Sequence, residues 1–240
     1  MAFIIDDAQT HYVKGLEHLE SHKYINAIGD FTSAISLKRD FADAYYQRAK
    51  SKYLLGKEAG FFSTDLCYDL ISAIKYGNDN ALDMLLEKST TQCYSAKSMN
   101  VDPDVVFCAD LSSQVLSEIP ANAQKFDFLA HLNLFDNKFK AIPSAVFNYQ
   151  YLVHLDISSN QIQTLTADIA KLTYLRELNL NKNEIKTLSS EIYNLKKLKR
   201  LFLRQNSLTS LPESIAKLGA LKELDLSLNQ LTSLPANLSK

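Results

Sequence analysis

Five asparagines recur at one fixed interval in the carboxy-terminal half of the chain. They are Asn137, Asn160, Asn183, Asn206 and Asn229, and each lies 23 residues after the one before it. Apolar residues stand five and three positions before each asparagine and two positions after it. A period of this length is typical of stacked repeats, in which each unit buries its apolar side only against its neighbours. Such an array also leaves a long open surface, which favours binding.

The repeating unit reads Leu-x-x-Leu-x-Leu-x-x-Asn-x-Leu-x-x-Leu-Pro-x-x-Ile-x-x-Leu, and residues 198–218 match it at every position. Four other units match it nearly as well, those that begin at Leu129, Leu152, Leu175 and Leu221. A degenerate unit precedes them from Val106. The Leu-x-Leu alternation predicts a short strand, and the Ile-x-x-Leu end predicts a helical turn. We expect each asparagine amide to bond backbone groups of its own turn and the next, which is a structural role.

These six units resemble the leucine-rich repeat family, in its intracellular variety of 23 residues with Leu-Pro after the strand. The resemblance covers residues 106–240. It implies a solenoid with parallel strands on its concave face and short helices or turns on its convex face. Terminal repeats of such arrays are usually atypical, which fits the degenerate first unit.

Residues 8–89 follow a helical period instead. The pattern Tyr24-x-x-Ala27-Ile28-x-x-Phe31 recurs in weaker form after Asp65. Small residues, Gly15 and Ala49, precede the two copies where pairs of helices would cross closely. This spacing resembles tetratricopeptide repeats, whose unit is about 34 residues long. The resemblance implies helical hairpins, although His11 and Arg39 depart from the family pattern.

The chain is therefore predicted to have an α+β architecture of two domains. Tetratricopeptide-like helical hairpins fill residues 1–89, a polar connector spans 90–105, and a leucine-rich repeat solenoid of about six repeats fills 106–240. We expect the helical block to cover the amino-terminal edge of the solenoid.

Composition narrows the class of protein. The hydrophobic content of 46% excludes a disordered chain, and the net charge of −1 gives no general reason for nucleic-acid or membrane binding. No apolar stretch has the length of a membrane span, and the first residues lack the basic start of a signal peptide. Three scattered cysteines, Cys67, Cys93 and Cys108, suggest reduced thiols. These features predict a cytoplasmic protein.

The sequence offers no catalytic constellation. His18 and His22 are spaced as a helical metal pair, but Leu-Glu-Ser lies between them and no third ligand has a sensible spacing. A solvated helix face explains them better. Phosphate-binding loops and nucleophile motifs are missing from the sequence. We therefore expect no enzyme activity, no cofactor and no metal.

Residues that flank the strand leucines should point outward on the concave face. Most are small and polar, but two groups differ. We expect one anchor for a partner at Arg200, Phe202 and Arg204, and a second at His131, Phe135 and His154, with Asp156 among the outward residues between them. Exposed aromatic rings and arginines are the residue types that anchor interfaces. The alternative is that these are tolerated surface residues.

The helical block has a second candidate surface. The tetratricopeptide resemblance implies a groove lined by Tyr12, Leu16, Tyr46, Lys50 and Tyr53. Some members of that family clamp a carboxy-terminal carboxylate with lysine and asparagine, but Tyr12 and Leu16 occupy those positions here. Packing of the tyrosines against the connector is the alternative.

The leading functional hypothesis is a non-enzymatic scaffold or adaptor that binds a protein or peptide. A second hypothesis is a recognition or regulatory subunit of a larger enzyme or signalling assembly. The third is a self-assembling element, because the leucines of the last unit, from Leu221 to Leu234, have no polar cap. Such an edge invites an end-to-end homodimer.

Overall fold

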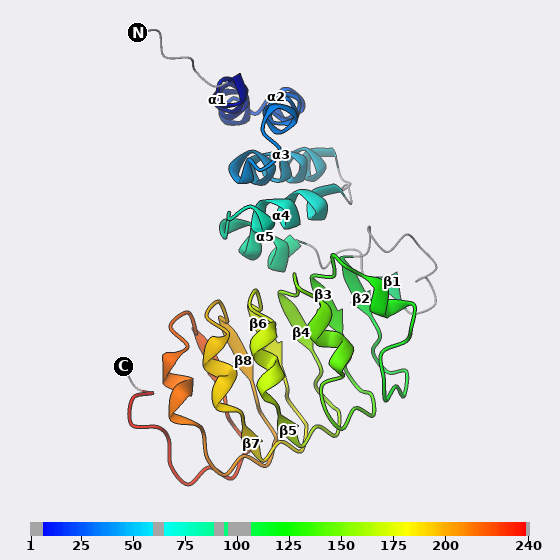
Figure 1. Ribbon diagram of the computed structural model, residues 1–240, viewed down its shortest axis with the longest axis vertical. Helices are drawn as coiled ribbons and strands as arrows, with labels where there is room; N and C mark the ends of the chain where they lie inside the picture. Colours follow the sequence, from blue (N-terminus) through cyan, green and yellow to red (C-terminus); the bar gives the residue numbers. More distant parts are fainter. Residues whose placement is uncertain (1–6, 60–64, 89–93, 96–106, 239–240) are drawn as a thin grey trace. The chain divides into compact units, whose positions relative to one another are not determined.

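The computed structural model describes residues 7–59, 65–88, 94–95 and 107–238. The chain divides into two compact units, Met1–Glu87 and Lys88–Lys240. The first contains helices, and the second contains a parallel sheet with short helical turns (Figure 1). The predicted α+β fold, with helices first and a repeat solenoid after them, is confirmed.

Five α-helices form the first unit: α1 (Asp7–Glu20), α2 (Tyr24–Leu37), α3 (Ala42–Ala59), α4 (Asp65–Lys75) and α5 (Asn80–Lys88). Helix α1 packs against α2, α2 against α3, and α3 against α4. The apolar positions Ala27, Phe31 and Ala34 of α2 are fully buried, as their helical spacing predicts. Among the described residues, no helix is long and apolar enough to cross a membrane.

A buried ion cluster joins α3 to α4. The carboxylate of Asp69 is completely buried and accepts hydrogen bonds from Arg48 Nε (3.0 Å) and Nη2 (2.6 Å). Lys52 Nζ lies 2.9 Å from the same carboxylate. A buried charge requires partners of this kind, so the cluster fixes the pairing of the two helices.

The close helix crossing predicted at Gly15 is present. A Cβ atom added to Gly15 would lie 2.6 Å from the ring of Phe31, whose side chain is fully buried. The helical backbone at position 15 does not require glycine. The contact with the Phe31 ring does, because it leaves no room for a side chain. Helices α1 and α2 can therefore approach each other only while position 15 has no side chain.

We expect Gly15→Ala to destabilise the protein by about 1–3 kcal/mol, because the added methyl group must displace a packed aromatic ring. Gly29→Ala is the matched control. Gly29 lies on the same pair of helices with open space around it, so alanine there should be neutral or stabilising by about 0.5–1 kcal/mol. Urea unfolding of both variants measures the difference. Equal stability of the two variants would contradict the close crossing.

The second unit is built on a seven-stranded parallel sheet. Its strands, in spatial order, are β1 (Tyr94–Ser95), β2 (Cys108–Asp110), β3 (His131–Asn133), β4 (His154–Asp156), β6 (Glu177–Asn179), β8 (Arg200–Phe202) and β9 (Glu223–Asp225). From β2 onward, each residue pairs with the one 23 positions later, as Leu132 does with Leu155. The repeat period of the sequence is therefore the register of the sheet.

Short helical turns follow the strands on the other side of each repeat (Figure 1). They are η4 (Ala123–Lys125), η5 (Ser144–Asn148), η6 (Ala167–Lys171), η7 (Ser190–Asn194) and η8 (Glu213–Lys217). Strands β5 (Thr164–Leu165) and β7 (Thr187–Leu188) form a second, two-stranded sheet. Each turn from η5 to η8 places one apolar residue, such as Ile169 or Ile192, in the core between the two sides.

The asparagine ladder ties neighbouring repeats together. Asn160 Nδ2 donates to the carbonyls of Leu134 (3.0 Å) and Ile157 (3.1 Å), and its Oδ1 accepts from the backbone N–H of Phe139 (3.0 Å). The same pattern recurs at Asn137, Asn183, Asn206 and Asn229. The structural role predicted for these residues is confirmed, but the neighbour that they bond is the preceding repeat rather than the next.

A residue with left-handed backbone precedes each asparagine of the ladder, and Ser113, which has the same conformation, precedes Gln114 of the degenerate first unit. Six residues have φ between 53° and 57°: Ser113, Asp136, Ser159, Lys182, Gln205 and Leu228. This conformation turns the backbone so that the following side chain points into the array. All six have a Cβ atom that crowds the following carbonyl, and leucine also lacks the short polar side chain with which Asn or Asp bonds the local backbone.

We expect Leu228→Asn to stabilise the array by about 1 kcal/mol, because asparagine tolerates the left-handed conformation better. Leu228 is 61% exposed, so little packing is lost. The control is Leu228→Val, in which the branched Cβ should have the opposite effect. Thermal unfolding of the three proteins decides the order, and a less stable asparagine variant would refute the argument.

Two expectations about the amino-terminal edge of the array need correction. Strand β1 lies inside the segment predicted to be a connector, and it pairs Tyr94 with Ala109 and Ser95 with Asp110. The sheet thus begins before residue 106, with β1 paired to β2. The remainder of the predicted connector, 90–93 and 96–105, lies outside the described residues.

The second correction concerns the cysteines. Cys108 is disulfide-bonded, whereas Cys67 is a buried free thiol whose pKa is raised to about 12 by burial. The third cysteine of the sequence, Cys93, lies outside the described residues. The expectation of three reduced thiols is wrong, because cysteine spacing does not reveal which sulfurs meet in space. Disulfides are rare in the cytosol, so the thiol argument for a cytoplasmic location no longer holds.

Candidate binding surface

The outward side chains of the strands form one face of the array, here called the sheet face. The last residues of the strands form a column on this face, and most of their side chains accept hydrogen bonds from the backbone. In five of six repeats the last strand residue is Asp or Asn: Asp110, Asn133, Asp156, Asn179 and Asp225. Each accepts a hydrogen bond from the N–H two residues ahead, as Asp156 does from Ser158 at 2.9 Å. Such Asx turns close the exposed end of a strand. Asp156, a predicted contact residue, also accepts from Asn179 Nδ2 at 2.9 Å and is held by the array.

Phe202 is the one departure from this column. Its ring cannot accept a hydrogen bond, so the N–H of Arg204, two residues ahead, needs another partner. Asn181 Oδ1 of the preceding repeat accepts it at 2.6 Å. The equivalents of Asn181 in other repeats are Ser112, Phe135, Ser158, Arg204 and Ser227, none of which has a side-chain amide. The array therefore keeps an aromatic ring where its backbone favours Asp or Asn, and a neighbouring repeat supplies the missing bond.

The first predicted anchor is assembled at β8. Arg200 Nε donates to Glu177 Oε2 at 2.6 Å, so its guanidinium is paired with a carboxylate of the adjacent strand. The guanidinium of Arg204 is exposed and donates through Nη1 to the neutral hydroxyl of Ser227 at 3.0 Å. The half-buried ring of Phe202 lies between these two positions in the chain. The strand and the residues after it thus present an aromatic ring between an arginine that pairs with Glu177 and an arginine that bonds Ser227 and interacts with the Asp225 carboxylate.

The second predicted anchor is less accessible. His131 is only 2% exposed, and its ring packs edge-on against that of His154, with centroids 5.4 Å apart. His131 supports its neighbour and does not present a surface. Phe135, by contrast, is 40% exposed. In the sheet order, β3 is about 14 Å from β8, whereas β4, which carries His154, is about 10 Å from β8.

A row of titratable groups links these anchors. His154 Nε2 lies 3.9 Å from Glu177 Oε1, and Glu177 also holds Arg200. Burial lowers the pKa of His154 from its ordinary value, although the carboxylates of Glu177 and Asp156 act in the opposite direction. His154 is therefore neutral at pH 7, and the Glu177 carboxylate remains committed to Arg200.

A hollow of about 370 Å³ opens on the helical unit. It is lined by Leu16, Leu19, Glu20, His22, Tyr24, Gln47, Lys50 and Leu54. Two residues of the predicted groove, Leu16 and Lys50, are therefore brought together. Tyr12 instead packs in the core, with its ring centroid 4.8 Å from that of Phe41, and Tyr46 and Tyr53 are half-buried elsewhere on α3.

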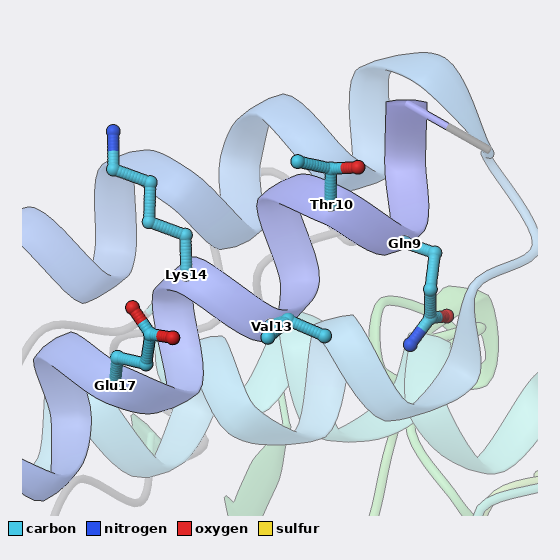
Figure 2. Close-up of a pocket in the computed structure, with 5 residues that line it drawn as sticks. All are labelled: Gln9, Thr10, Val13, Lys14 and Glu17. Atoms are coloured by element: carbon cyan, nitrogen blue, oxygen red, sulfur yellow. The ribbon is translucent and has the colours of Figure 1, made fainter. Parts of the chain in front are cut away.

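A second hollow, of about 340 Å³, lies on the outer side of α1. Gln9, Thr10, Val13, Lys14 and Glu17 line it. Figure 2 shows these side chains spread along the helix without converging on one point. This hollow therefore lacks the converging polar groups of a small-molecule site.

The two histidines expected on one helix are separated, because α1 ends at Glu20 and His22 lies in the turn after it with φ of 58°. His18 Nδ1 lies 2.6 Å from Asp30 Oδ2, and His22 Nδ1 lies 2.7 Å from the Tyr24 hydroxyl. Within the described part of the chain, no three His, Cys, Asp or Glu side chains form a group that could hold a metal ion.

The leucine-rich repeat family model matches the array in three overlapping stretches, residues 128–185, 150–203 and 173–231. No curated protein is significantly similar to the chain in sequence. A leucine-rich repeat protein of Leptospira interrogans is similar in structure, with 30% identity and a TM-score of 0.53. The match covers 60% of this chain and 43% of the Leptospira protein.

Two further structures share lower overall similarity. An internalin of Listeria monocytogenes is 32% identical, with a TM-score of 0.44, over 51% of this chain and 36% of that one. The other is the leucine-rich repeat ectodomain of the Arabidopsis thaliana receptor kinase GASSHO1/SCHENGEN3, in complex with CASPARIAN STRIP INTEGRITY FACTOR 2. It is 32% identical, with a TM-score of 0.48, and the match covers 57% of this chain and 17% of that one. This chain thus spans less than half the length of each of these proteins.

Proposed function

We propose that the chain, whose residues 128–231 match the leucine-rich repeat family model, is a non-enzymatic scaffold or adaptor that binds a protein or peptide on its sheet face. The observation that carries the proposal is that Phe202 occupies a position that holds Asp or Asn in the other repeats. The backbone favours Asp or Asn at this position, yet an aromatic ring is kept there and Asn181 replaces the lost bond. A residue that opposes a local structural preference and is compensated nearby is expected at a functional site.

The surroundings of Phe202 fit an anchor for a protein. Aromatic and arginine side chains dominate the energy of most interfaces, and Arg200 and Arg204 lie on either side of the ring in the chain. The pairing of Arg200 with Glu177 holds its guanidinium in place before a partner arrives. Phe135 provides a second exposed ring on the same face. The hollow around Leu16 and Lys50 offers the helical unit a further contact.

The decisive variant is Phe202→Asp. An aspartate should restore the Asx turn to the N–H of Arg204, so the array should remain folded while the ring is lost. We expect partner binding to weaken by about 2 kcal/mol, roughly thirtyfold. Immobilised wild-type and variant chains capture partners from a lysate of the source organism, and titration calorimetry with the purified partner gives the affinities.

Two further variants complete this experiment. Phe135→Ser places at position 135 the residue found there in three other repeats, and it should weaken binding less. Leu37→Ser is the control, because it removes an exposed apolar side chain from the helical unit, 55% exposed, and should leave binding unchanged. Undiminished capture by Phe202→Asp would refute the assignment of the sheet face. Capture of an enzyme as the stable partner would favour the regulatory-subunit alternative.

A homodimer through the last repeat is the second candidate. In the described residues β9 is the final strand of the sheet, and Leu224 within it and Leu226 directly after it are only partly buried. Leu234 is 58% exposed. A second copy of the chain would cover these leucines. Light scattering over a concentration series should then show a rising mass, whereas a constant monomer mass argues against the dimer.

A further inference from the structure

Two lysines of the array rest on one tyrosine ring. Lys196 Nζ lies 4.5 Å from the ring centroid of Tyr193, and Lys217 Nζ lies 5.5 Å from the same centroid. The lysines come from successive repeats, so the contact joins the turn after η7 to the end of η8. Lys197 makes a similar contact with Tyr174 at 4.7 Å. We call these five residues the lysine ridge.

An aromatic ladder fixes the other end of the ridge. The ring of Tyr174 stacks on Tyr151 with centroids 6.2 Å apart, and Tyr151 stacks on Phe128 at 6.1 Å. The three rings stand 23 residues apart, directly before the first leucine of each unit. Because a stacked ring has little freedom, Tyr174 holds the ammonium group of Lys197 in place. A cation over a ring also keeps N–H donors for an anion.

The ridge concentrates positive charge in a chain whose net charge is −1. Residues 193–200 contain four basic side chains and no acidic one. The structure places two of these lysines, Lys196 and Lys197, on aromatic rings. Lys196 and Lys217 are both exposed. The ridge lies along the helical turns, so it is distinct from the sheet face that carries Phe202.

We propose that the lysine ridge binds an acidic segment of a partner protein, through carboxylate side chains that accept hydrogen bonds from the placed ammonium groups. Single-stranded nucleic acid is less suitable, because lysines and neighbouring rings already lie against the tyrosine rings on which bases would stack. The ridge also has no guanidinium for two-point recognition of phosphate.

Neighbouring acids favour a peptide over a uniform polyanion. Glu191 and Glu213 stand in the same short helices as the ridge residues Tyr193 and Lys217. They would repel the continuous negative charge of a membrane surface or a nucleic-acid backbone. A peptide with acidic residues at intervals can place its carboxylates on the lysines and its neutral residues opposite the glutamates.

The probe is a fluorescent peptide of alternating Glu and Gly, compared with one of Gln and Gly, by anisotropy at low salt with the full chain. We expect Lys196→Gln/Lys217→Gln to weaken binding of the Glu peptide by about tenfold. The control is Lys138→Gln/Lys186→Gln, which removes the same charge from exposed positions elsewhere in the array and should change affinity by less than about twofold. Equal losses in the two double variants would overturn the proposal.

The variant Tyr193→Leu distinguishes the effect of holding the two lysines in place from the effect of their positive charge. Leucine keeps the net charge and an apolar side chain but removes the ring below both lysines. We expect the affinity for the Glu peptide to fall by about threefold. Unchanged affinity would overturn the role of the ring. Tighter binding to phosphatidylserine vesicles or to single-stranded RNA than to the Glu peptide, lost in the Lys196→Gln/Lys217→Gln variant, would overturn the assignment to a protein segment.

Discussion

The hydrogen bonds of the asparagine ladder set the geometry on which the rest of the array depends. Each amide satisfies backbone carbonyls in its own turn and in the preceding repeat, at positions that are largely closed to water. Leaving those groups unpaired would cost about 1–3 kcal/mol each. The bonds require a left-handed residue before each asparagine and a fixed offset between repeats. The strand register and the rows of outward side chains follow from that offset.

Because the repeats are so regular, a residue that differs from its equivalents in the other repeats indicates a role other than holding the array together. The sheet face closes each strand with an Asx turn except at Phe202, where Asn181 of the neighbouring repeat supplies the bond. The lysines of the helical side meet aromatic rings because a 23-residue step brings them together across repeats. The two proposed surfaces thus rest on different features of one lattice. One is an aromatic exception to the backbone pattern, and the other is a set of cations held on rings.

Much of the fold could be predicted from the sequence, because repeat period and apolar spacing are local properties. Alternating leucines placed the strands, and Gly15 marked a close helix crossing. The candidate site was predicted less completely. His131 looked like a surface residue but is buried beside His154, and the disulfide at Cys108 gave no local signal. Strand β1 was missed because two residues are too short to show a pattern.

The sequence by itself determined the period, the direction in which each strand residue points and the structural role of the asparagines, since these depend on residues close together in the chain. Only the tertiary structure decided which side chains on that lattice are free to act. Pairing of Arg200 with Glu177, rescue of the Arg204 N–H by Asn181 and seating of Lys217 on Tyr193 all join residues 23 or 24 positions apart. Contacts at that separation exist only after the repeats have stacked.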